Sequence, residues 1–167
     1  MLRYTVGNFL MLVLVLAVTE VWAVAPYQPV HSNPLLEPWR WRSFPELKGQ
    51  GLMCLAEDID GNMWFGTQDG VWRYDGTIWS AFGKGEGLDG SSVVALAASE
   101  TGTVYAATRI GIYSYKAGAA LWDRFFPPRG ELPWLINDLV VGPDEEVWAG
   151  TGWGILLLGK QEQVLYT

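Results

Sequence analysis

The sequence predicts an all-β fold made of repeated, similar units. Three segments carry the same order of glycine, threonine and aromatic residues, and the threonines at their centres, Thr67, Thr108 and Thr151, are 41 and then 43 residues apart. The 167-residue chain also contains 10 Trp and 20 Gly, and half of it is apolar. Large flat side chains and frequent tight turns favour packed sheets over helices. A repeat of this length is typical of one blade of a β-propeller.

Each repeat divides into four strand-like runs. The first begins with an apolar run at Leu52 that we expect to be covered on both sides, followed by Asp-Gly turn chemistry. The strands expected are 52–57, 62–67, 71–75 and 78–82, then 93–98, 103–108, 111–115 and 121–125, then 136–141, 146–151, 154–158 and 164–166. The sequence therefore predicts a partial β-propeller of three four-stranded antiparallel blades, at about 52–82, 93–125 and 136–166.

One further strand is expected before the first blade. The fourth strands of two blades share the spacing Trp-x-x-Phe, and it occurs once earlier: Trp79 with Phe82, Trp122 with Phe125, and Trp41 with Phe44. Residues 26–38 are rich in proline and are predicted as a linker, so no matching strands precede the early copy. We therefore expect an orphan N-terminal strand at 39–44, and an incomplete propeller over 39–167.

The first 25 residues have the features of a signal peptide. Arg3 precedes an apolar run at 9–18, which as a helix would rise only about 15 Å, half of a hydrocarbon core. Such a run fits a signal peptide better than a membrane anchor. Cleavage frames end at Ala23 and at Ala25, and an uncleaved hydrophobic tether is the alternative. We expect a periplasmic or secreted protein that touches a membrane only through an uncleaved signal, and the single Cys54, which allows no internal disulfide, favours a bacterial envelope.

Positions shared by the repeats are expected to serve the scaffold. Gly70 and its two counterparts, Gly111 and Gly154, follow a turn and need backbone freedom or a close neighbour. The threonine hydroxyls can bond to that turn. The large rings of the second strands are expected to fill the gaps between adjacent blades, and they are Trp64, Tyr105 and Trp148.

The composition argues against several classes of function. The net charge is −7 and no basic patch is visible, so nucleic acid is not expected as a partner. His31, the only histidine, lies in the linker, which removes the commonest acid–base group and metal ligand from the repeats. Asp58 and Asp60 are predicted in a hairpin turn, because the later acidic ligands of a calcium loop are missing. We predict no catalytic residue, no metal and no cofactor, and therefore not an enzyme.

Candidate ligand-binding residues lie where equivalent turns and connections differ. In a propeller, the turns between second and third strands and the connections between blades line one entrance of the central channel. The turns carry Asp69, Arg109 and Trp153, and the last connection carries Arg129 and Trp134. Rings that stack on a sugar and polar groups that bond its hydroxyls are what carbohydrate binding requires. We predict these five residues as a site for an oligosaccharide or another small ligand; packing beneath its own loop is the alternative for Trp134.

At the repeated positions the chain resembles the two-component regulator propeller family. The first repeat carries the pattern at Asp60-Gly61, Trp64-Phe65-Gly66-Thr67, Gly70-Val71 and Tyr74-Asp75. The third repeat has Leu158 in place of the last aromatic, and the second has Ala107 in place of the Gly of Gly-Thr. The resemblance covers 39 to the C-terminus.

The resemblance implies a propeller of seven or a similar number of blades in the periplasmic part of a bacterial sensor. Such a sensor perceives a ligand, often an oligosaccharide, and passes the signal through the membrane to a histidine kinase. The function implied for this chain is a non-catalytic, extracytoplasmic ligand-sensing segment. The alternative is a structural or protein-interaction segment that assembles with another chain.

The number of blades also points beyond the chain. Propellers usually close with four to eight blades, whereas the repeats here supply three. We expect either a piece of a longer protein with a downstream kinase region, which is favoured, or a homo-oligomer in which copies close the ring together.

Overall fold

The computed structural model describes residues 42–130, 132, 134–159 and 163–166. The signal peptide expected at 1–25 and the linker expected at 26–38 lie outside the described residues. The chain divides into two units, at 1–43 and 44–167, and the fold below is that of the second.

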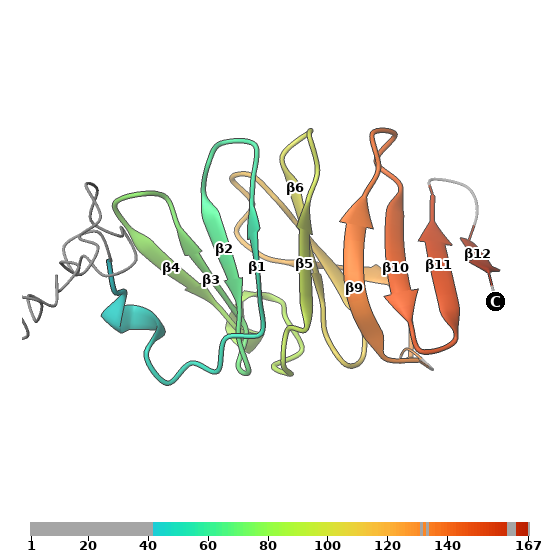
Figure 1. The fold of residues 1–167 in the computed structure, drawn as a ribbon, viewed down its shortest axis with the longest axis horizontal. Helices are drawn as coiled ribbons and strands as arrows, with labels where there is room; N and C mark the ends of the chain where they lie inside the picture. The colour runs from blue at the N-terminus through green and yellow to red at the C-terminus, as the bar shows by residue number, and fades with distance from the viewer. Residues whose placement is uncertain (1–41, 131, 133, 160–162, 167) are drawn as a thin grey trace, which may run out of the picture. The chain divides into compact units, whose positions relative to one another are not determined.

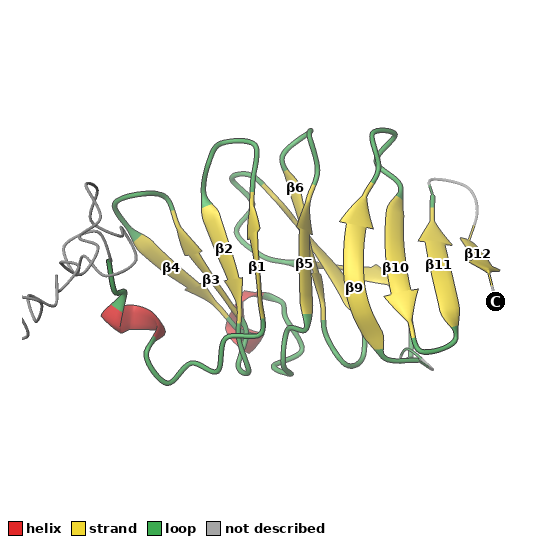
Figure 2. Cartoon of the chain, in the orientation of Figure 1, coloured by secondary structure: helices red, strands yellow, loops and turns green. Residues whose placement is uncertain are grey.

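The second unit consists of three separate four-stranded antiparallel sheets, each formed by consecutive strands (Figures 1 and 2). Blade 1 contains β1 (Cys54–Glu57), β2 (Met63–Gly66), β3 (Val71–Tyr74) and β4 (Trp79–Phe82). Blade 2 contains β5 (Ala95–Ala98), β6 (Thr103–Ala107), β7 (Ile112–Lys116) and β8 (Asp123–Phe126). Blade 3 contains β9 (Ile136–Val141), β10 (Val147–Thr151), β11 (Gly154–Leu158) and β12 (Gln163–Tyr166). This is the predicted partial propeller, with every predicted blade strand present within a few residues of its expected bounds.

The first strand of each blade is its inner strand. The three inner strands lie next to one another, β1 beside β5 and β5 beside β9 (Figure 1). Two short 3-10 helices, η3 (Pro45–Leu47) and η4 (Lys84–Glu86), lie in the segments that lead into blades 1 and 2. The hairpins reverse at two opposite ends of the sheets, so each end gathers one set of turns from all three blades.

The orphan N-terminal strand is not formed where it can be checked. Residues 39–41 lie outside the described part, and Arg42 to Phe44 belong to no strand. The Phe44 ring packs against Tyr74 and Trp79, with centroids 5.5 and 5.4 Å away. Pro45 opens a 3-10 helix directly afterwards. Side-chain packing therefore holds the described end of this segment, without strand pairing.

Blades 1 and 2 are joined by a cluster of aromatic rings. Trp64, 1% exposed, lies 5.7 Å from the Phe82 ring of its own blade. It also lies 5.3 Å from Tyr115 and 5.9 Å from Trp122 of blade 2. The Trp64 indole N–H donates to the Asp58 carboxylate at 2.7 Å, so its polar edge is satisfied as well. The ring fills the gap between the blades as predicted.

Blades 2 and 3 pack with smaller side chains. On the blade 2 side, Tyr105 packs against the Phe125 ring of its own blade at 5.0 Å. The rest of the contact is mostly aliphatic, with Leu139, Leu156 and Leu158 all buried. Tyr105 therefore lies in the gap between blades 2 and 3 as predicted but does not fill it. Trp148, the third repeated ring, lies on the face of blade 3 that points away from blade 2.

The prediction that the first apolar run is covered on both sides is wrong. Within β1, Leu55 is exposed, while Cys54 and Ala56 pack toward blade 2; Leu52, which precedes the strand, is exposed as well. Alternate residues of a strand point to opposite faces. Only one face of β1 has a neighbouring blade in the described part of the chain, so only one set is covered.

Cys54 is predicted to react slowly with thiol reagents. Its thiol donates to the Val93 carbonyl at 3.6 Å, and burial, with a smaller contribution from the Asp138 charge, raises its pKa to about 11. Because the thiolate is the reactive form, labelling of the folded protein at pH 8 should be roughly 100-fold slower than in denaturant. Stopped-flow labelling with and without urea measures this, and equal rates would contradict the burial of the thiol.

Candidate functional site

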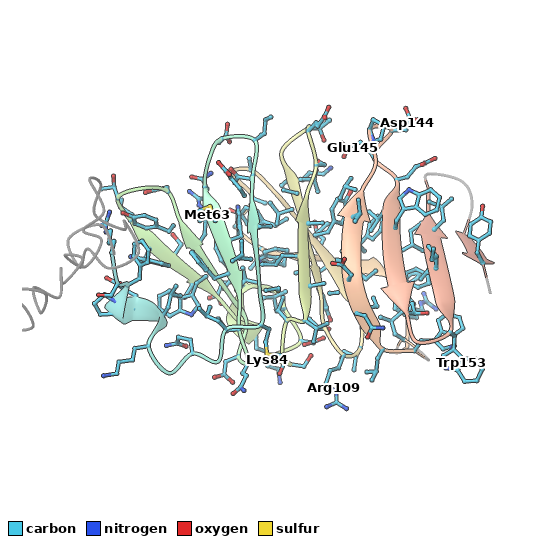
Figure 3. All side chains as sticks on the ribbon, viewed as in Figure 1. Met63, Lys84, Arg109, Asp144, Glu145 and Trp153 are labelled. Atoms are coloured by element: carbon cyan, nitrogen blue, oxygen red, sulfur yellow. The ribbon has the colours of Figure 1, made fainter. Side chains whose placement is uncertain are left out.

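The three predicted variable turns lie at one end of the blades. They join β2 to β3, β6 to β7 and β10 to β11, and Arg109 and Trp153 project from this end together with Lys84 of the first connection (Figure 3). We call it the turn end.

A repeated threonine–glycine hydrogen-bond pair shapes each of these turns. The threonine hydroxyl donates to the glycine carbonyl at 2.9, 3.1 and 2.8 Å, in Thr67–Gly70, Thr108–Gly111 and Thr151–Gly154 respectively. The same hydroxyl oxygen accepts the backbone N–H of a variable residue, from Asp69, Ile110 and Trp153. The prediction that these hydroxyls bond to the turn is confirmed. The threonine–glycine hydrogen bonds are the same in all three turns, whereas the residues between the threonine and the glycine differ.

The connection between blades 1 and 2 is attached to the second turn through Asp89. Its carboxylate accepts hydrogen bonds from both the backbone and the side chain of Ser91, and it shares the single Thr108 hydroxyl proton with the Gly111 carbonyl. Burial alone would raise the pKa of Asp89, but the hydrogen bonds from Ser91, Thr108 and Tyr113 outweigh it and hold the pKa below its usual value. The ionised carboxylate therefore anchors the connection to the turn.

Arg124 attaches the connection between blades 2 and 3 to the same turn. Its guanidinium donates to the Ile110 carbonyl at 2.8 Å and to the Gly130 carbonyl at 2.6 Å. It also lies over the Tyr113 ring, 5.8 Å from the centroid. The turn next to Arg109 is thus tied to the connections on both sides, which gives the turn end a defined shape.

A hollow of about 470 Å³ opens at this end, beside the inner strands. It is lined by Met53, Ser92, Val94, Thr108, Arg109, Leu135, Ile136 and Asn137. The polar groups are one guanidinium, one amide and two hydroxyls, and the remaining lining is aliphatic. Such a set suits a ligand that carries hydroxyl or anionic groups on a partly apolar body.

The five predicted site residues are distributed over the turn end and its connections. Arg109 lines this hollow, and Asp69 lines a different hollow of about 370 Å³ within blade 1. Trp153 is 70% exposed at its turn. Arg129 is exposed and Trp134 is half-buried in the last connection. The structure does not gather the five around one cavity.

Sequence reasoning missed most residues of the hollow. Three of these residues occupy equivalent positions at the inner strands of the blades. Each lies two residues before a leucine that pairs with the second strand: Met53 before Leu55, Val94 before Leu96, and Asn137 before Leu139. Each therefore lies where an inner strand reaches the turn end. Their common offset from the repeat was a usable signal, but residue type gave none.

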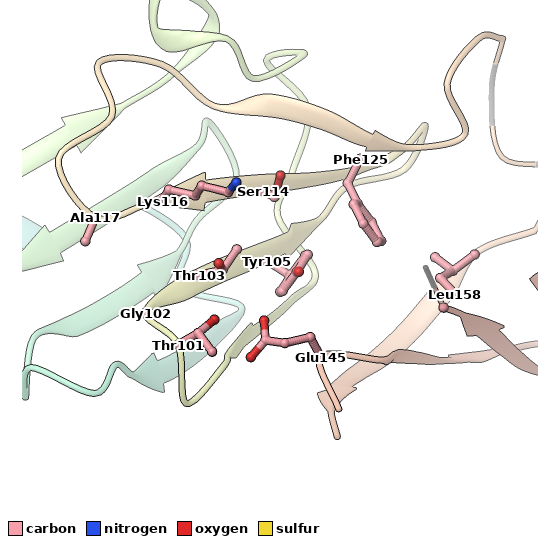
Figure 4. Close-up of a pocket in the computed structure, with 11 residues that line it drawn as sticks. Thr101, Gly102, Thr103, Tyr105, Ser114, Lys116, Ala117, Phe125, Glu145 and Leu158 are labelled. Atoms are coloured by element: carbon pink, nitrogen blue, oxygen red, sulfur yellow. The ribbon is translucent and has the colours of Figure 1, made fainter. Parts of the chain in front are cut away.

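A second cavity of about 710 Å³ lies between blades 2 and 3 at the opposite end (Figure 4). Glu145 extends toward Thr101 across it, and its backbone has a positive φ of 63°, unusual for a residue with a side chain. Burial, assisted by the Glu145 charge, raises the pKa of Tyr105, whose ring also lines the cavity. The space exists because Tyr105 and Leu158 here replace the bulkier Trp64 and Tyr115 of the first interface.

Comparison with known proteins supports the predicted repeat. Residues 46–69 match the model of the two component regulator propeller. This segment of the first repeat is therefore similar to a two-component regulator propeller repeat. The match includes η3, β1 and β2 and ends at the first turn of the turn end. No curated protein matches the chain significantly.

Several solved structures share the fold. An extracellular domain assigned to a hybrid two component system of B. thetaiotaomicron is 18% identical, with a TM-score of 0.58, over 72% of this chain and 17% of that one. PorZ, a surface component of the type-IX secretion system of Porphyromonas gingivalis, is 18% identical with a TM-score of 0.55, over 75% and 22%. A gluconolactonase of Xanthomonas campestris is 20% identical with a TM-score of 0.50, over 66% and 44%.

The chain thus spans less than half the length of each of these three structures. At such identities the likeness shows the fold, a propeller, and not a shared activity. Among the described residues there is no group of three or more His, Cys, Asp or Glu side chains placed to hold a metal ion. In the same part of the chain, no helix has the length and apolar character needed to cross a membrane.

Proposed function

We propose that this chain is part of a ligand-sensing propeller of an extracytoplasmic signal receptor. The observation that carries the proposal is the two-component regulator repeat at 46–69, within a fold that resembles the extracellular domain of a hybrid two component system. The receptor would signal through a downstream kinase region. The predicted signal peptide supports a periplasmic or secreted location.

The ligand we propose is an oligosaccharide or a similar polyhydroxylated molecule bound at the turn end. Arg109 and Asn137 offer a cation and an amide within the hollow, and Ser92 adds a hydroxyl. The exposed indole of Trp153 supplies a ring on the same end that can cover a sugar face. Arg129 and Trp134 belong to the connection that leads into this hollow.

The sensing role is proposed without catalysis. Of the similar structures, one is a gluconolactonase, and the others compared above are an extracellular domain of a hybrid two component system and a secretion-system component. The carboxylate held in place at the turn end, Asp89, is occupied by hydrogen bonds to Ser91 and Thr108. It therefore serves the scaffold rather than a reacting substrate.

The ligand is tested by calorimetry of the purified chain against a panel of neutral and acidic oligosaccharides. For a sugar that binds, Arg109→Ala should weaken affinity roughly tenfold or more, because a charge-assisted hydrogen bond is lost. Trp153→Ala should also weaken it, through loss of stacking. Lys116→Ala is the matched control, since it removes a cation at the opposite end of β7.

The results separate the two cavities. Loss of binding in Arg109→Ala with retention in Lys116→Ala supports the turn end. The reverse pattern would place the ligand in the cavity between blades 2 and 3, which Lys116 lines. Unchanged affinity in both Arg109→Ala and Trp153→Ala would remove these residues from the site.

A further inference from the structure

The cavity between blades 2 and 3 exists because this interface carries smaller side chains than the one between blades 1 and 2. Three register positions differ, with Tyr105, Ser114 and Leu158 in place of Trp64, Arg73 and Tyr115. At the first interface the Trp64 ring meets the Tyr115 ring at 5.3 Å and lies beneath the Arg73 guanidinium, 5.7 Å from its carbon. The smaller residues leave about 710 Å³ at the corresponding place. Pockets that bind small molecules have volumes of about 300–1,000 Å³.

Hydroxyl groups without a hydrogen-bond partner line this cavity. Thr103 and Tyr105 are 8% and 6% exposed, and both line the cavity together with the half-buried Ser114 (Figure 4). In the part of the chain that the structure describes, none of these three hydroxyls forms a hydrogen bond with a protein group. Buried polar side chains are hydrogen-bonded in the large majority of cases. A polar occupant of the cavity is therefore needed to satisfy them.

Two opposite charges lie on different walls of the cavity. Lys116 comes from the end of β7 in blade 2, and Glu145 comes from the turn between β9 and β10 in blade 3 (Figure 4). Neither side chain forms an ion pair within the described residues. The Glu145 charge acts inside the cavity, because it adds to burial in raising the pKa of Tyr105. The cavity thus offers a cation and an anion that do not neutralise each other.

Glu145 occupies a position that favours glycine. The same place in the repeat, six residues before the repeated threonine, holds Gly61 in blade 1 and Gly102 in blade 2, with φ of 80° and 84°. Glu145 keeps this left-handed backbone, with a φ of 63°. A side chain there costs free energy that glycine avoids, and such strain gathers at functional sites. Blade 3 therefore bears a strained residue that places a carboxylate in the cavity.

We propose that this cavity binds a small zwitterion, namely a free amino acid or a short peptide with an apolar side chain. The Lys116 ammonium and the Ser114 hydroxyl, which alternate along β7 and so share one face, donate to the ligand carboxylate. The ligand ammonium donates to the Glu145 carboxylate and to the Tyr105 hydroxyl. Each charge of the ligand then meets a charge that the protein itself leaves without a partner.

The apolar part of such a ligand has a matching wall. Phe125 and Leu158 lie together on one side of the cavity (Figure 4). A ligand with a single charge would leave Lys116 or Glu145 without a partner, and a neutral sugar would leave both. An amino acid or peptide with an apolar side chain matches the cation, the anion and the apolar wall together.

This site is separate from the proposed sugar site. None of the described residues lines both the cavity and the hollow at the turn end, and the two lie at opposite ends of the blades. Both walls of the cavity come from blades 2 and 3, which pack against each other in the same core cluster. The result of one binding test therefore does not decide the other.

Calorimetry of the purified chain with a set of matched probes tests the proposal. The zwitterions are L-leucine and leucyl-leucine, and each is compared with its N-acetylated form, which lacks the ammonium, and with its C-terminal amide, which lacks the carboxylate. At least one zwitterion should bind. Its two blocked forms should bind roughly tenfold more weakly, because each loses a charge-assisted hydrogen bond. The tighter zwitterion identifies a free amino acid or a peptide as the ligand.

Two variants assign each ligand charge to its residue. In Lys116→Met, the zwitterion and its amide should bind with affinities within about twofold of each other, and in Glu145→Gln the same should hold for the zwitterion and its N-acetylated form. Lys48→Met and Glu100→Gln remove exposed charges outside the cavity and are the matched controls, which should keep the full discrimination. Circular dichroism checks that all four variants fold.

Glu145→Gly separates binding from a structural role of the turn. Because glycine relieves the strain of a positive φ, this variant should melt at a higher temperature than the unmodified chain, while its affinity for the zwitterion falls roughly tenfold. A lower melting temperature would show that Glu145 serves the turn and would overturn its role in binding. Unchanged discrimination in both charge variants, equal affinities for free and blocked forms, or no binding of either zwitterion, with water alone filling the cavity, would overturn the proposal as a whole.

Discussion

Replacing Trp64 with alanine is expected to lower the free energy of unfolding by about 3–5 kcal/mol. The ring is 1% exposed and contacts Phe82, Tyr115 and Trp122 across the first blade interface. Its removal leaves a large cavity that neighbouring strands cannot fill. It also takes the indole donor away from the Asp58 carboxylate. Urea unfolding monitored by circular dichroism measures the change.

Two further variants separate the contributions of Trp64. Trp64→Phe keeps a ring in the gap but loses the hydrogen bond to Asp58, so an intermediate loss is expected. Trp153→Ala makes the same truncation at an exposed site and should change stability by less than about 0.5 kcal/mol. Equal effects of Trp64→Ala and Trp153→Ala would contradict the role of the first interface in stability.

Gly70→Ala is expected to destabilise the chain by roughly 3 kcal/mol or more. Gly70 has a φ of 146°, in a region that residues with side chains rarely adopt. A Cβ at this position would also lie 2.2 Å from the Phe82 backbone carbonyl oxygen, which cannot move without breaking the pairing of β3 with β4. Backbone strain and a steric clash therefore act together.

Gly76→Ala is the matched control for this substitution. Gly76 also has a positive φ, 94°, but a Cβ there would meet nothing within 4 Å. Its cost should be limited to backbone strain, about 1–2 kcal/mol. Thermal unfolding of both variants gives the difference. A Gly70→Ala protein as stable as Gly76→Ala would mean that β4 does not approach this turn as closely as the structure has it.

The repeat predicted the strands well because local chemistry sets them. Asp-Gly and Thr-x-x-Gly sequences place the turns, and alternating large and small apolar residues between them favour strands. The Trp-x-x-Phe spacing, which is that of a fourth strand, predicts a strand at 39–44, but residues 42–44 form none. A strand also needs a neighbouring edge to pair with, and the spacing of two rings carries no information on that.

The candidate site could be predicted only in part. Arg109 was found because its position varies within a constant turn frame, and it does line the hollow at the turn end. Ser92 and Leu135 come from connections whose course depends on the bonds of Asp89 and Arg124. These bonds join residues far apart in the sequence, so the pattern of one repeat does not contain them.

By itself, the sequence determined the positions of the three described blades, their strand order and the constant positions of each turn, because these follow from the period and from local hydrogen bonding. Only the tertiary structure decided which faces of the blades are covered. Leu55 and Leu96 have the same residue type and the same register, yet one is exposed and the other is buried. The difference is the presence of a neighbouring sheet, since burial depends on what packs against a strand as well as on the strand itself.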